Sequence, residues 1–99
     1  MAYSVQIGQD AQGDLDAVSA ADYGRLVQAI NDQLTYEPTK ETRNRKPMQP
    51  VHAAGQPAPA SWELRVQPYR VYYNVNQAEQ RVDVVRVARK DRETARPAR

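Results

Sequence analysis

Alternating hydrophobic and polar residues predict strands near both ends of the chain. Residues 3–8, "YSVQIG", alternate over a short span, as a half-buried strand does. The same period of two runs through "SWELRVQPYRVYYNVN", residues 61–76, on both sides of Gln67-Pro68. We therefore predict strands over residues 3–8, 61–66, 69–75 and 81–88.

Between the first strand and the later ones, the spacing of apolar residues becomes helical. One helical stripe contains Tyr23, Leu26, Val27, Ile30 and Leu34. Ser19 stands before this helix as an N-cap, and Asp22 three residues later resembles a capping box. Pro38 ends the helix near Tyr36, because the residue before a proline is pushed out of the α-helical region. Residues 10–18 are predicted to form a shorter helix.

Proline marks the segment between the helices and the later strands. Residues 38–60 hold five of the seven prolines and are predicted to form a long loop, whose front half, "KETRNRK", is basic. The element order β-α-α-β-β-β predicts an α+β fold, with both N-terminal helices packed on one face of an antiparallel sheet. At 99 residues the chain has room for one small domain, which we place at residues 1–90, followed by a basic tail over 91–99.

The predicted hairpin at Gln67-Pro68 has a register that follows from its alternation. A two-residue loop places three apolar pairs on one face: Trp62 with Tyr73, Leu64 with Val71, and Val66 with Tyr69. The opposite face then carries Glu63 against Tyr72, and Arg65 against Arg70. Like charges directly across from each other destabilise a sheet, so this face needs an explanation.

The last strand is placed on the assumption that Arg86 shares a face with Arg70. The core side then gains Asp83, Val85 and Val87, with Asp83 near its edge. The open face carries a row of arginines across three strands, with two neighbours beside them: Arg65, Arg70, Arg86, Tyr72 and Val84.

Two interpretations fit this row of arginines. In the first, it is a solvated sheet face whose arginines pair with Glu63 or with distant acids. In the second, which the row as a whole favours, the guanidinium groups bind the phosphates of an RNA or DNA backbone. Tyr72 would add a base-stacking platform or a hydroxyl for proton transfer. Three basic loop residues would extend the same surface: Arg43, Arg45 and Lys46.

The composition and charge of the chain exclude several kinds of site and favour one cellular location. The net charge is only +2, but residues 81–99 are basic and residues 10–32 carry acids with one arginine. The absence of cysteine excludes disulfides and thiolate metal sites and favours a reducing compartment. No signal-peptide pattern and no apolar run of membrane-spanning length occur, so we expect a cytoplasmic protein without membrane contact. No phosphate loop or metal-spaced cluster occurs either, so we expect no cofactor and no metal, and His52 is interpreted as a loop residue.

Three stretches together resemble one protein superfamily. They are "LTYEPTKETRNRKPM", "SWELRVQPYRVYYNVN" and "RVDVVRVARK". These stretches are similar to the RelE/ParE superfamily of bacterial type II toxin–antitoxin toxins, over about residues 34–90. The resemblance implies the β-α-α-β-β-β order and a cognate antitoxin as partner.

The resemblance also implies two possible activities. RelE-like members cut ribosome-bound mRNA without a metal: the 2′-hydroxyl attacks the adjacent phosphate, and basic side chains stabilise the developing charge. By this resemblance the catalytic residues are Arg65, Arg70 and Lys90, and Arg89 is the other candidate for the last position and an RNA contact. ParE-like members inhibit DNA gyrase instead.

Two positions depart from the nuclease pattern. Glu63 stands where a lysine is expected two residues before Arg65, and "DRETARPAR" lacks the expected C-terminal tyrosine. The leading hypothesis is an RNA-targeting toxin that acts on the ribosome and its mRNA. The alternative is a non-enzymatic interaction module, such as a DNA gyrase inhibitor or a degenerate member that binds its antitoxin or RNA. A third hypothesis is a small RNA-binding domain outside the superfamily.

Overall fold

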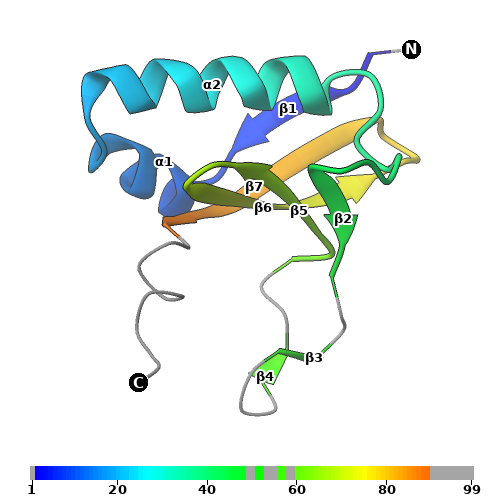
Figure 1. Ribbon diagram of the computed structural model, residues 1–99. Coiled ribbons are helices and arrows are strands. Elements are labelled where there is room, and N and C mark those ends of the chain that lie inside the picture. The colour runs from blue at the N-terminus through cyan, green and yellow to red at the C-terminus, as the bar shows by residue number, and fades with distance from the viewer. Residues whose placement is uncertain (1, 49–50, 53–55, 58–59, 90–99) are drawn as a thin grey trace.

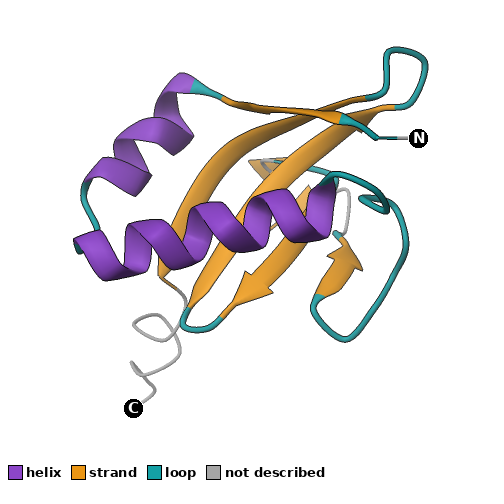
Figure 2. Ribbon diagram, turned by 90° about the horizontal axis from the view of Figure 1, so that it is seen from above, coloured by secondary structure: helices purple, strands orange, loops and turns teal. Residues whose placement is uncertain are grey.

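The chain folds into two layers, with two helices over one face of a five-stranded sheet (Figures 1 and 2). The structure is a computed structural model, and it describes residues 2–48, 51–52, 56–57 and 60–89. The helices are α1 (Gln9–Asp16) and α2 (Ala20–Leu34). The sheet contains β1 (Ser4–Ile7), β2 (Arg45–Pro47), β5 (Trp62–Val66), β6 (Tyr69–Asn76) and β7 (Arg81–Arg89). The predicted α+β fold, with both helices on one face, is confirmed.

The direction of β1 corrects one part of the prediction. The strand order is β1-β7-β6-β5-β2, and β1 pairs with β7 in parallel, so the sheet is mixed rather than antiparallel. A parallel neighbour requires a long connection, and everything from α1 to β6 separates these two strands in the chain. Alternation within a strand carries no information about the direction of its neighbour.

The predicted loop over residues 38–60 is the second correction. It contains β2, which pairs antiparallel with β5 and forms one edge of the sheet. It also contains the short ladder of β3 (Val51–His52) with β4 (Gln56–Pro57), which lies on the side of the sheet away from α2 (Figure 1). Proline is tolerated at the end of an edge strand, so Pro47 did not exclude a strand there.

Helix α2 is capped and oriented largely as its sequence predicts. The Ser19 hydroxyl accepts a hydrogen bond from the Asp22 backbone N–H at 3.2 Å, which confirms the N-cap. The helix buries Leu26, Ile30 and Leu34 against the sheet. Tyr23, which the predicted stripe included, is exposed. Among the described residues, no helix is long and apolar enough to cross a membrane.

The register of the β5–β6 hairpin is confirmed in full. Trp62 pairs with Tyr73, Leu64 with Val71 and Val66 with Tyr69, while Glu63 faces Tyr72 and Arg65 faces Arg70. The apolar set packs into the core with α1 and α2. This register is determined by the alternation, because a slip of one residue would expose every apolar member.

The prediction of which β7 side chains point toward the core is wrong for the first half of the strand, because the strand contains an irregularity. The register shifts between Tyr72 and Tyr73, so that Tyr72 pairs with Arg86 while Tyr73 pairs with Val84. Val85 is left without a partner opposite, as in a β-bulge. Val84 is therefore fully buried in the core rather than on the open face. Asp83 lies outside the core, and Val87 lies inside it as predicted.

Candidate functional site

The sheet face away from the helices carries the predicted site. Across the four antiparallel strands, Lys46 lies opposite Glu63, Glu63 opposite Tyr72, and Tyr72 opposite Arg86. We call this surface the arginine face, and it consists of Lys46, Glu63, Arg65, Arg70, Tyr72 and Arg86. The assumption that Arg86 shares a face with Arg70 therefore holds.

Glu63 explains how two arginines can face each other. Its Oε2 accepts a hydrogen bond from Arg65 Nε at 3.0 Å and another from Arg70 Nη1 at 3.1 Å. The three side chains are largely buried, with exposed fractions of 12% for Glu63, 34% for Arg65 and 19% for Arg70. One shared carboxylate thus offsets the repulsion between the two guanidinium groups. Arg70 Nε is buried and has no hydrogen-bond partner among the described residues, so within them this cluster has one unused donor.

Arg86 forms an ion pair with Asp14 of α1, in the helix layer. Its Nε and Nη2 donate to the two carboxylate oxygens of Asp14 at 2.8 and 3.1 Å, and the Val87 backbone N–H donates to the same carboxylate at 2.8 Å. Burial on its own would raise the pKa of Asp14, but the hydrogen bonds from Arg86 and Val87 outweigh it and lower that pKa. The hydrogen bonds and the charge of Asp14 in turn raise the pKa of Arg86. Arg86 is therefore also a structural link between α1 and β7.

The basic loop residues divide between surface and interior. Arg43 is exposed, and Lys46 is half-buried on the arginine face. Arg45 was expected on the RNA-binding surface, but it is only 6% exposed and points toward α2. Its Nη1 donates to the Gln33 carbonyl oxygen at 2.5 Å, and its Nη2 lies 3.9 Å from a Glu37 carboxylate oxygen. Arg45 is thus an interior residue of the described chain rather than part of the basic surface.

The remaining predicted site residues are Tyr72, Arg89 and Lys90. Tyr72 is buried, with 7% exposed, so its ring is not an open stacking platform. Arg89 is exposed, and its guanidinium lies 5.7 Å from the centre of the Tyr69 ring. Lys90 lies outside the described residues. The structure therefore brings Arg65 and Arg70 together, whereas Arg89, which lies across from Tyr69 next to Arg70, is on the other face of the sheet, with the core residue Tyr69.

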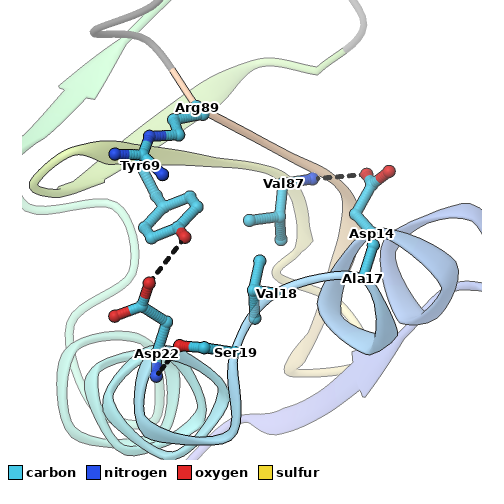
Figure 3. A pocket seen from close by; sticks show the side chains of 8 residues that line it. All are labelled: Asp14, Ala17, Val18, Ser19, Asp22, Tyr69, Val87 and Arg89. Carbon is cyan, nitrogen blue, oxygen red and sulfur yellow. Dashed lines mark hydrogen bonds between the residues drawn. The ribbon is translucent and has the colours of Figure 1, made fainter.

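A separate hollow lies at one end of the two layers, where α1 meets α2 (Figure 3). It has a volume of about 370 Å³. Its lining comes from the helix connection and from the adjoining ends of two strands: Asp14, Ala17, Val18, Ser19, Asp22, Tyr69, Val87 and Arg89. The sequence analysis did not predict this hollow, because its lining combines residues of the helices with strand residues about 50 to 70 positions later in the chain.

Asp22 and Tyr69 join the two layers beside this hollow. The Tyr69 hydroxyl donates to Asp22 Oδ2 at 2.8 Å, and Arg25 Nη2 lies 3.4 Å from Asp22 Oδ1. The hydrogen bond from Tyr69, helped by Arg25, lowers the pKa of Asp22 and raises the pKa of Tyr69. In the described part of the chain, no group of three or more histidine and acidic side chains could hold a metal ion.

Comparisons with known proteins relate this architecture to toxins. A family model described as the ParE toxin of the type II toxin–antitoxin system parDE matches residues 5–94. The chain is similar to a structure of the RelBE2 toxin–antitoxin complex from Mycobacterium tuberculosis, with a TM-score of 0.69 and 21% identity over 90% of this chain and 99% of that chain. It is equally similar to a structure of the archaeal RelE–RelB complex from Pyrococcus horikoshii OT3, with a TM-score of 0.69 and 22% identity over 93% of this chain and 99% of that chain. At such identities the likeness shows the fold alone, and no curated protein matches the sequence.

Proposed function

Because the chain belongs to the ParE toxin family of type II toxin–antitoxin systems, we propose that it acts in the cytoplasm by binding DNA gyrase rather than by cutting RNA. The observation that carries this choice is the position of Glu63 between Arg65 and Arg70. Two of the three cations that a RelE-type nuclease would use are thus already bound to an anion of the same chain.

The charge of Glu63 opposes a second anion at this place. Metal-free RNA cleavage needs free cations that stabilise the charge developing on the phosphate. A phosphate that approaches to about 4 Å from the Glu63 carboxylate would be repelled by roughly 4 kcal/mol at an effective dielectric constant of about 20, which cancels the attraction of about one guanidinium group at the same distance. Because Glu63 is largely buried, solvent screens this repulsion only in part. These features favour a toxin that acts by binding a protein.

A plasmid supercoiling assay tests the proposed target. Purified gyrase and relaxed plasmid are incubated with increasing amounts of the protein, and supercoiled plasmid is measured on a gel. We expect the supercoiled product to decrease as the protein concentration rises. Equal supercoiling with and without the protein would remove gyrase as the target.

RNA cleavage is a second candidate, and one observation favours it. Lys46 lies directly across from Glu63 on the neighbouring strand, so the arginine face has a cation next to the position where a lysine was expected. Together with Arg65 and Arg70, the four charged side chains carry a net charge of +2, which suits a phosphate backbone.

Cleavage of ribosome-bound mRNA separates the two candidates. A nuclease predicts that the wild type cuts the mRNA, that Arg70→Ala does not, and that Glu63→Lys cuts faster because it restores the expected lysine. The gyrase proposal predicts no cutting by the wild type. Lys40→Ala is the control, since it removes a cation whose side chain is 64% exposed and which is not among the predicted RNA contacts.

A further inference from the structure

The two edges of the sheet differ in how their backbone groups are protected. At the β2 edge, the Arg45 N–H donates to the Thr42 hydroxyl at 3.1 Å, and the Arg45 carbonyl oxygen accepts from the Thr42 N–H at 2.8 Å. Pro47, on the same strand, has no N–H, and Lys46 adds a charge. Charged residues, proline and bonded backbone groups on an edge strand prevent pairing with another strand. The β2 edge is therefore closed.

The outer edge of β1 lacks this protection. β1 is the last strand of the sheet, and among the described elements only β7 makes extensive contact with it. The N–H groups of Ser4 and Gly8 donate to carbonyl oxygens on the β7 side, at 2.8 and 2.9 Å. Because backbone groups alternate in direction along a strand, the N–H and C=O groups of Val5 and Ile7 point to the outer edge. No described residue bonds to them there.

The open part of this edge is short and uncharged. It is bounded on one side by Tyr3, whose N–H donates to the Thr35 carbonyl oxygen at 2.6 Å, and on the other by α1, which begins at Gln9. Residues 2–9 contain no charged side chain. A matching strand must therefore be short, carry no opposing charge and offer two donors and two acceptors. The β1 strand of a second copy of the chain meets all three requirements.

We propose that two copies of the chain pair along β1, antiparallel, around a twofold axis at Gln6. Val5 of one copy then lies opposite Ile7 of the other, and each pair exchanges two backbone hydrogen bonds, so every free group of both edges is used. An axis at Val5 would instead place Ile7 opposite Tyr3, whose N–H is already bonded to Thr35. The exposed side chains of Gln6 lie opposite each other across the axis.

This pairing joins the two sheets into one continuous sheet. The twofold axis is perpendicular to the sheet, so the helices of both copies lie on one side and both arginine faces lie on the other. The pairing does not depend on whether the target is gyrase or RNA. Because the interface is short, we expect it to be weak and to exchange readily between monomer and dimer.

A charge exchange at Gln6 tests both the surface and the register. The oligomeric state of the full chain is measured by sedimentation from about 10 μM to 1 mM, where we expect the wild type to shift from monomer to dimer. Gln6→Lys and Gln6→Glu each place like charges across the axis and should raise the Kd of the dimer at least about fivefold. An equimolar mixture of the two variants should associate at least as tightly as the wild type, because opposite charges then face each other.

The matched controls are Gln77→Lys and Gln77→Glu, at an exposed position in the turn between β6 and β7. They make the same charge changes far from β1 and should leave the Kd of the dimer within about twofold of the wild type. Thermal unfolding checks that all four variants fold. Amide hydrogen exchange locates the contact, because Val5 and Ile7 of the wild type should exchange more slowly as the protein concentration rises.

Three results would overturn the inference. The first is a wild type that stays monomeric over the whole concentration range. The second is a dimer that both Gln6 variants leave unchanged, which would place the interface elsewhere. The third is a mixture of the Gln6 variants that associates no better than either variant alone. Since these measurements read the oligomeric state, a negative gyrase assay leaves them unaffected.

Discussion

Glu63 is the residue on which the electrostatics of the β5–β6 hairpin depend. It occupies a position where the nuclease pattern has a lysine, and its carboxylate bonds to both Arg65 and Arg70. Without it, two largely buried guanidinium groups would face each other across the strands. The same side chain therefore stabilises the sheet and reduces the affinity of the arginine face for phosphate.

Replacing Glu63 with alanine should destabilise the fold. Arg65 and Arg70 would lose a shared, charge-assisted hydrogen-bond acceptor, which we expect to lower the free energy of unfolding by about 1–3 kcal/mol. Urea unfolding measures this change. Glu41→Ala, at an exposed position, is the control and should change the free energy by less than about 0.5 kcal/mol. Equal stabilities of the two variants would contradict the structural role of Glu63.

The hydroxyl of Tyr73 is a second single group with a measurable effect. It donates to the Pro38 carbonyl oxygen at 2.6 Å in the core, and burial raises the pKa of Tyr73, so it remains a donor. Tyr73→Phe leaves this carbonyl without its partner and should cost about 1–2 kcal/mol of unfolding free energy. Tyr36→Phe, at a residue that is 67% exposed, should be nearly neutral. No difference between the two variants in urea unfolding would refute the prediction.

At the scale of elements, the connection from α2 to β2 is held by buried polar bonds. The Tyr73 hydroxyl donates a hydrogen bond to the Pro38 carbonyl oxygen in this connection. The side chain of Arg45, on β2, donates to the Gln33 carbonyl oxygen near the end of α2. The Arg65 backbone N–H donates to the Asn44 carbonyl oxygen at 2.7 Å. The edge strand β2 is therefore positioned by its bonds to α2 and β5, although it has only three residues.

Replacing Arg45 with alanine tests this arrangement. The variant leaves the Gln33 carbonyl unsatisfied and removes a packed aliphatic stem, which together should cost about 2–3 kcal/mol. Hydrogen exchange should show faster opening of the β2 amides than of the β6 amides, because β2 loses its attachment to α2. Arg43→Ala is the control at an exposed arginine. Unchanged exchange at β2 in Arg45→Ala would argue against a role for Arg45 in holding this strand.

At the scale of the whole molecule, two aspartates join the helix layer to the sheet. Asp14 on α1 binds Arg86 and Val87 of β7, and Asp22 on α2 binds Tyr69 of β6. The pKa values of both aspartates are lowered from 3.8 in the folded protein. The folded state therefore binds protons at these groups less readily than the unfolded state, and acid favours unfolding.

The contribution of Asp14 to stability should depend on pH in a definite direction. It is fully present above the unfolded pKa of 3.8 and is lost as the pH falls through the lower folded pKa. The difference in unfolding free energy between the wild type and Asp14→Asn, measured in urea, should therefore shrink on acidification below that value. The shrinkage should be smaller when both proteins also carry Arg86→Ala. A difference that stays constant with pH would contradict the assignment.

The alternation of residues in the sequence by itself determined the hairpin and the helix stripe. Each apolar residue of β5 and β6 had to share a face with its cross-strand partner, and the burial of Leu26, Ile30 and Leu34 followed from helical spacing. These features depend on local periodicity and on one short turn. The pairing of Arg65 with Arg70 follows from the same register, so it too was predictable from the alternation alone.

Only the tertiary structure decided which charged side chains form ion pairs or are buried, and in which order the strands lie in the sheet. The parallel pairing of β1, the bulge at Val85 and the burial of Arg45 leave no periodic signal in the chain. Arg86 and Asp14 are 72 residues apart in sequence, so their ion pair exists only because α1 packs beside β7. The arginine face was therefore predictable as a set of positions, whereas its charge balance and the hollow at the end of the layers depend on contacts between distant segments.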